Sequence, residues 1–124
     1  MTNNKYKGIS LDKASHFDTE ALSMLEEIME DEFPDLIQVY IADSDPRVNA
    51  LQQALDAKDC TQLRHISHSF KGASGNIAAL PLADLCFKLE EDAHGDSLEN
   101  IPSLISRIDN EYQSVRSILL SLVS

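Results

Sequence analysis

The residue best suited to chemistry in this chain is His68, which lies on a strongly patterned predicted helix. Apolar residues recur along that helix at steps of three and four, and they are Leu63, Ile66, Phe70, Ala73 and Ile77. Because each helical residue turns about 100° from the last, His68 points away from this apolar stripe and toward solvent. An exposed imidazole with one free nitrogen lone pair can act as a nucleophile, so His68 is the candidate reactive group.

The neighbours of His68 on the same outward face suit an anion. Arg64 lies one turn before it, Lys71 and Gly72 lie one turn after it, and Gly75 lies two turns after it. Glycine inside a helix costs on the order of 1 kcal/mol relative to alanine, so helix stability does not explain the two glycines. Their missing side chains would let a second protein approach the imidazole, and the cations would offset the charge of a phosphoryl group. We therefore expect Lys71 to stabilise that group, and Arg64, Gly72 and Gly75 to lie where a partner approaches.

Two other interpretations of these residues remain open. His68 could be a solvated residue of a helical bundle that acts only as a docking adaptor. Alternatively, the His65–His68 spacing and the sequence Glu91-x-x-His94 suggest a metal-binding helical bundle. A carboxylate-bridged di-iron site needs two Glu-x-x-His units, however, and the second is missing here. We expect no metal site, and we interpret His16, His65 and His94 as surface or packing residues.

Composition excludes several classes of partner and activity. The 124 residues include 21 acidic and 10 basic side chains, and the formal net charge of −11 repels nucleic acid and anionic lipid on average. No apolar stretch approaches the roughly 20 residues that cross a bilayer. Nothing at the N-terminus resembles a secretory signal, and the sequence contains no C-x-x-C pair and no Walker loop for ATP. We therefore expect a cytoplasmic protein with no nucleic-acid partner, no membrane partner and no ATP-dependent kinase activity.

The elements that position His68 are all predicted to be helices. Apolar residues make up 43% of the chain and aromatic residues only 6%, and no segment alternates apolar and polar residues as a half-buried strand does. Helical stripes cover about residues 18–29, 33–58, 59–77, 81–94 and 101–122. Ile28 is assigned to the packed face of the first helix, and Pro46 would either kink the second helix or divide it.

These stripes predict an all-α fold, an antiparallel four-helix bundle with an additional short N-terminal helix across one end. Residues 1–15 show no sustained period, so they are expected to form a flexible N-terminal arm. The folded domain is assigned to residues 16–124. A bundle of this size can close on itself, and we expect a monomer.

The segment from His68 to Asn76, HSFKGASGN, resembles the signature of the histidine phosphotransfer (HPt) domain family. The segments MEDEFP (29–34), DSDPR (43–47) and LCFKLE (85–90) are similar to freestanding single-domain members, and the resemblance spans roughly residues 18–120. It implies that His68 is phosphorylated and that Lys71 helps to neutralise the phosphoryl group. Ala78 stands where these domains often have glycine. Because alanine adds only a methyl group and favours helix, we expect the chemistry to survive.

The resemblance also implies the reaction and the partners. His68 would accept a phosphoryl group from a receiver-domain aspartate of a hybrid sensor kinase and pass it to the receiver of a response regulator, in a two-component phosphorelay. Glu90 would accept a hydrogen bond from Nδ1–H of His68 and leave Nε2 as the nucleophile. The receiver would bring the aspartate and its Mg²⁺, so this chain is expected to bind no cofactor and to be a phosphocarrier, not an enzyme.

Overall fold

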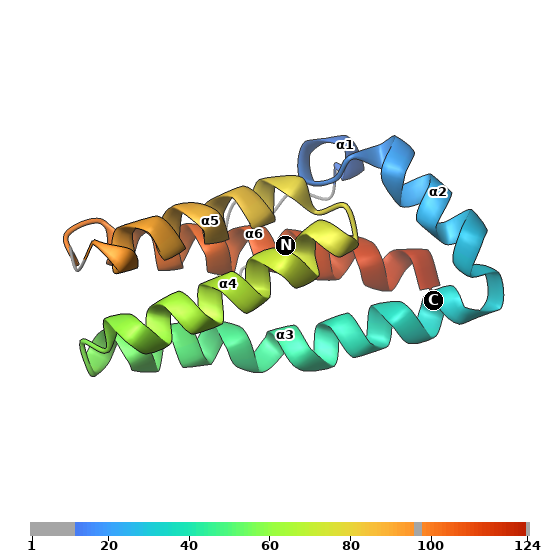
Figure 1. Cartoon of the computed structure of the whole chain (residues 1–124). Coiled ribbons are helices and arrows are strands. Elements are labelled where there is room, and N and C mark those ends of the chain that lie inside the picture. The colour runs from blue at the N-terminus through green and yellow to red at the C-terminus, as the bar shows by residue number, and fades with distance from the viewer. Residues whose placement is uncertain (1–11, 96–97, 124) are drawn as a thin grey trace, which may run out of the picture.

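The computed structural model describes residues 12–95 and 98–123, and every regular element within them is helical (Figure 1). In chain order these elements are α1 (Lys13–His16), α2 (Thr19–Met29), the 3-10 turn η1 (Glu30–Glu32), α3 (Phe33–Asp56), α4 (Cys60–Asn76), α5 (Leu80–His94) and α6 (Ile101–Val123). Helices α3 to α6 run alternately up and down, and each packs against two others, since α6 closes the ring against α3. The predicted antiparallel bundle preceded by a short helix is confirmed.

The core lies along the axis of this bundle and is made by the predicted stripes. On α6 the buried apolar side chains are Ile101, Leu104, Ile105, Ile108, Tyr112, Val115, Ile118 and Leu119. Tyr112 meets Phe70 of α4 edge-on, with ring centroids 5.6 Å apart, a favourable aromatic geometry. Phe70 is fully buried, so the opposite face of α4 is turned to solvent.

Helix α3 continues through Pro46 without a break. Proline removes one backbone donor and normally interrupts a helix, yet α3 extends from Phe33 to Asp56 as one element. Buried Ile37 lies before the proline and buried Leu51 after it. Both halves therefore pack on the same core, which offsets the lost hydrogen bond.

Helix α2 crosses the end of the bundle at which α4 turns into α5 (Figure 1). Asp18 starts it, because its side chain accepts a hydrogen bond from Ala21 N–H at 3.1 Å. The N–H of Asp18 also donates to the carbonyl of Ala78 at 2.9 Å, which ties α2 to the α4–α5 turn. Leu22 is buried, but Ile28 is 72% exposed. The packed position predicted for Ile28 is wrong, because a helix across the end of a bundle has neighbours on one narrow side only.

The turn between α4 and α5 has an unusual backbone at Ala78. Its φ is 66°, in the left-handed region where a Cβ atom is unfavourable. Helix α4 ends at Asn76, one residue before the predicted end of this helix, and Ala78 lies in the turn that follows. Glycine adopts such a φ at no steric cost, so this backbone conformation would suit the glycine that the family resemblance leads one to expect here.

The predicted N-terminal arm, residues 1–15, lies mostly outside the described residues, and its boundary stays a prediction. Residues 13–15 belong to α1, which Asp12 caps through its contact with Ala14 N–H at 3.3 Å. His16 ends α1 and is only 7% exposed. Its Nδ1 lies 2.7 Å from Glu111 Oε2 of α6, so α1 is attached to the bundle through this pair.

Candidate functional site

His68 lies near the middle of α4 on the face turned away from the core. Asp59 starts this helix by accepting a hydrogen bond from Gln62 N–H at 3.1 Å. Leu63 and Phe70 are fully buried on the inner face. The His68 side chain is 69% exposed, in the direction that the apolar stripe predicts. A second protein can therefore reach the imidazole.

Glu90 reaches His68 from the neighbouring helix α5. Its Oε2 lies 2.8 Å from His68 Nδ1. A carboxylate can only accept a hydrogen bond, so Nδ1 of His68 donates in this pair. A neutral imidazole that donates from Nδ1 keeps its lone pair on Nε2, on the other side of the ring. This is the contact expected of Glu90.

The same carboxylate also holds Lys71. Lys71 Nζ donates to Glu90 Oε1 at 2.8 Å, and the two side chains are 30% and 22% exposed. Partial burial by itself would raise the pKa of Glu90, but the hydrogen bonds and charges of Lys71 and His68 outweigh it and hold the pKa below its ordinary value. Glu90 is therefore an ionised bridge between the imidazole and the ammonium group.

Phe87 completes the surroundings of Lys71 on the α5 side. The Lys71 Nζ lies 5.3 Å from the centroid of the Phe87 ring, within the range of a cation–π contact. The ring is 45% exposed. Sequence reasoning missed Phe87, although it precedes Glu90 by three residues on one helix and so lies on the same face.

Arg64 borders the site, and its guanidinium contacts His94 of α5. Its Nη1 lies 3.0 Å from His94 Nδ1, and since arginine only donates, His94 accepts through that nitrogen. The two residues help to line an open pocket of about 440 Å³, whose other walls are His65, His68, Glu90 and Glu91. His94 thus belongs to the surroundings of His68, which its spacing four residues after Glu90 could have indicated.

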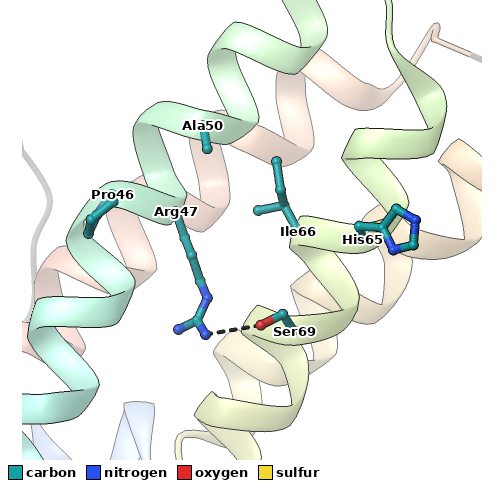
Figure 2. A pocket seen from close by; sticks show the side chains of 6 residues that line it. All are labelled: Pro46, Arg47, Ala50, His65, Ile66 and Ser69. Atoms are coloured by element: carbon teal, nitrogen blue, oxygen red, sulfur yellow. Dashed lines mark hydrogen bonds between the residues drawn. The ribbon is translucent and has the colours of Figure 1, made fainter.

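A second pocket, of about 290 Å³, lies between α3 and α4 (Figure 2). Its walls are Pro46, Arg47, Ala50, His65, Ile66 and Ser69. Arg47 points across it and donates to Ser69 Oγ at 3.0 Å (Figure 2). It also donates to Ser44 Oγ at 3.1 Å. Because His65 lines both pockets, this hollow adjoins the His68 site. Sequence reasoning did not place Arg47 there.

The two glycines of α4 leave the surface beside His68 open. A Cβ atom added at Gly72 or at Gly75 would meet nothing within 4 Å, so packing within the chain does not require glycine at either position. Gly75 also borders a third pocket, of about 240 Å³, whose exposed apolar walls include Met24, Ile28 and Leu80. These three side chains are 57%, 72% and 49% exposed. An exposed apolar patch of this kind is typical of a protein-binding surface.

Neither a metal cluster nor a membrane span is found in the described part of the chain. Among residues 12–95 and 98–123, no three His, Cys, Asp or Glu side chains are grouped so that they could hold a metal ion. No helix in the same ranges has the length and apolarity needed to cross a membrane.

Comparison with known proteins identifies the family. The family model of the Hpt domain matches residues 35–118, more than half of the chain. This chain belongs to the Hpt domain family. Its structure is similar to the crystal structure of histidine-containing phosphotransfer protein B (HptB) from Pseudomonas aeruginosa PAO1, with a TM-score of 0.86 and 40% sequence identity over 90% of this chain and 96% of that one.

Curated relatives from a phosphorelay support the same assignment. The phosphorelay protein LuxU of Vibrio vulnificus, from strains YJ016 and CMCP6, is 24% identical over 98 residues, which cover 78% of this chain and 85% of LuxU. The chain is thus a histidine phosphotransfer protein of the phosphorelay type, as the resemblance implied. The roles of the six predicted site residues stay predictions, and their geometry makes them testable.

Proposed function

We propose that this Hpt protein carries a phosphoryl group on Nε2 of His68 between the aspartates of two receiver domains. One receiver belongs to a hybrid sensor kinase and loads the protein, and the other belongs to a response regulator and unloads it. The observation that carries the proposal is the pairing of Glu90 with Nδ1 of an imidazole that is 69% exposed. That pairing keeps Nε2 free as the nucleophile.

The transfer exchanges one bond for another. The Nε2 lone pair attacks the phosphorus of the aspartyl phosphate, the N–P bond forms, and the P–O bond to the aspartate breaks, so the aspartate leaves as a carboxylate. The proton on Nδ1 stays on the ring, where ionised Glu90 accepts its hydrogen bond and offsets the positive charge that develops there. Such a reaction depends mainly on alignment and on charge stabilisation.

Lys71 supplies positive charge at the moment of transfer. Its Nζ is held 2.8 Å from Glu90 Oε1, on the same outward face of α4 as His68. A phosphoryl group on Nε2 competes with Glu90 for the ammonium, and a lysine carries three donors on a flexible stem, so it can serve both. The receiver brings the Mg²⁺ that neutralises the phosphoryl group on its own side, and this chain needs no cofactor.

The receiver approaches over the glycines. Gly72 and Gly75 offer open backbone beside the imidazole, and Met24, Ile28 and Leu80 add an apolar patch next to Gly75. Apolar contacts at the centre of an interface give affinity, and charged residues at its rim select among partners. Arg64 belongs to this rim.

Three further properties are part of the proposal. The protein is a carrier without ATP-dependent kinase activity, it acts as a monomer because its apolar stripes are buried within one chain, and it works in the cytoplasm. Light scattering on the purified protein tests the monomer.

The direct test is transfer from a phosphorylated receiver domain. The wild-type protein should acquire phosphate that is labile in acid and stable in base, as expected of phosphohistidine, and His68→Gln should acquire none. His65→Gln is the matched control, because His65 is an exposed histidine of the same helix, and it should be loaded normally. Transfer that persists in His68→Gln, or that depends on His65 instead, would falsify the assignment of His68. A protein that binds receivers without ever being loaded would be a docking adaptor.

A further inference from the structure

Phe87 is a large aromatic residue that the core does not explain. Nearly half of its surface is exposed, whereas Leu85, Cys86 and Leu89 on the inner face of α5 are buried. The ring faces the ammonium of Lys71, whose Nζ lies 5.3 Å from the ring centroid. The same ammonium donates to Glu90 Oε1 at 2.8 Å. Lys71 is thus held by one charged group and one uncharged group, both supplied by α5.

The two groups differ in how they affect an arriving phosphoryl group. A carboxylate attracts the ammonium but repels a phosphoryl group, whereas the face of an aromatic ring attracts a cation without carrying net charge. Lys88, on the outer face of the same helix, shows a lysine that pairs with a carboxylate, because its Nζ lies 3.2 Å from Asp84 Oδ2. A second carboxylate beside Lys71 would add negative charge next to His68 in a chain whose net charge is already −11.

We propose that Phe87 is a positioning residue for phosphotransfer, whose ring holds the Lys71 ammonium beside His68 while Glu90 shares that ammonium with the incoming phosphoryl group. The inference rests on the proposed function of His68. Without the ring, the four-carbon stem of Lys71 would sample solvent more freely, and less of its charge would be in place when the N–P bond forms.

The competing explanation is that Phe87 is only an apolar contact for the receiver. The two explanations predict different kinetics. A positioning residue changes the transfer rate at saturating receiver and acts through Lys71, whereas a docking contact changes the receiver concentration needed for half-maximal rate and acts without Lys71.

The experiment is a double-mutant cycle measured as single-turnover transfer from a phosphorylated receiver. Phe87→Leu keeps an apolar side chain and removes the ring, so the saturating rate should fall about two- to fivefold, the factor expected of one exposed cation–π contact. Phe87→Tyr keeps the ring and should transfer within about twofold of wild type. In a Lys71→Met background, Phe87→Leu should have no further effect. Leu120→Ala, which removes an exposed apolar side chain from α6, is the control and should leave the rate unchanged.

Two outcomes overturn the inference while the proposed function stands. One is a wild-type transfer rate for Phe87→Leu, and the other is an equal loss with and without Lys71. If the wild-type protein is never loaded, the proposed function fails and this inference fails with it. NMR relaxation of the Lys71 side-chain carbons gives a readout that needs no receiver. Their order parameters should fall in Phe87→Leu and remain in Phe87→Tyr, and unchanged order in Phe87→Leu would also contradict a positioning role.

Discussion

Glu90 approaches His68 across the α4–α5 interface and places Oε2 2.8 Å from Nδ1 of the imidazole. The two residues are 22 positions apart in the chain, and they meet because α4 and α5 are joined by a short turn and pack side by side. The imidazole gains an orienting partner while most of its surface stays accessible. The chemistry of the site therefore depends on the register of these two helices.

Replacing Glu90 should slow phosphotransfer without abolishing it. Glu90→Ala removes the acceptor for Nδ1–H, and the loss of a hydrogen bond to a charged group predicts a decrease of about tenfold in the single-turnover rate. The decrease should be smaller than that caused by loss of His68. Glu91→Ala is the matched control, since it removes an equal charge from the next, exposed position. If Glu90→Ala and Glu91→Ala slow transfer equally, the effect comes from the loss of negative charge and not from the orientation of His68.

The pKa of Glu90 should respond to its two partners. Lys71 and His68 hold this pKa below its ordinary value of 4.5. Lys71→Met and His68→Gln should each raise the pKa toward 4.5, which ¹³C NMR of the Glu90 carboxyl carbon can follow. Because the folded-state pKa is lowered, Glu90 stabilises the folded state above pH 4.5, and this contribution is lost as the pH falls through the folded-state pKa. A midpoint that does not move in either variant would contradict the bridging geometry.

Lys71 should affect the phosphorylated state more than the fold. Lys71→Ala removes the charge proposed to face the phosphoryl group, so transfer should slow by roughly tenfold, the effect of one partly exposed charge-assisted contact. Far-UV circular dichroism should be unchanged, because Lys71 lies on the surface. Lys88→Ala is the control, since it removes a lysine of α5 that pairs with Asp84 on the outer face. If both variants transfer at the wild-type rate, Lys71 has no electrostatic role.

The helical periodicity in the sequence predicts the bundle well, because buried stripes and their spacing are local properties of each helix. The inward direction of Phe70 and the outward direction of His68 both follow from it. Contacts that depend on how two helices pack against each other cannot be predicted from the periodicity of either helix. Ile28 has a helical apolar spacing but lies on a helix covered on one narrow side, and the predicted Arg64 turns its guanidinium to His94.

The candidate site divides in the same way, between residues that the face of one helix predicts and contacts that two helices make together. Lys71, Gly72 and Gly75 were found from the face of one helix, whereas Glu90 was found only through the family resemblance, since no local pattern relates it to His68. The Phe87–Lys71 contact spans two helices and was missed for the same reason. The left-handed φ of Ala78 was also not predicted, because it belongs to the α4–α5 turn, in which the N–H of Ala78 donates to the carbonyl of Gly75 at 3.0 Å.

Lys58 is a site at which the fold can be stabilised away from the chemistry. It follows the end of α3 with a φ of 54° and is exposed, and its N–H donates to the Leu55 carbonyl at 2.9 Å. Glycine is favoured at such a position, so Lys58→Gly should raise the free energy of unfolding by about 1 kcal/mol. Lys58→Ala keeps a Cβ atom at the same φ and should give little change. Urea unfolding curves measure both, and a gain in the alanine variant as large as that in the glycine variant would assign the effect to the lost charge.

Gly72 should show opposite effects on stability and on transfer. A Cβ atom at this position meets no other atom within 4 Å, and alanine is favoured over glycine inside a helix by about 1 kcal/mol, so Gly72→Ala should raise the unfolding free energy by up to that amount. The bulkier Gly72→Leu should fold as well but should weaken receiver binding, because its side chain occupies the approach to His68. Titration of a receiver domain against each variant measures this loss, and Gln62→Leu, on the exposed surface near the start of α4, is a control for added apolar bulk. If Gly72→Leu binds the receiver and transfers the phosphoryl group like the wild type, the missing side chain at position 72 does not serve a partner. The stability that glycine costs helix α4 would then need another explanation.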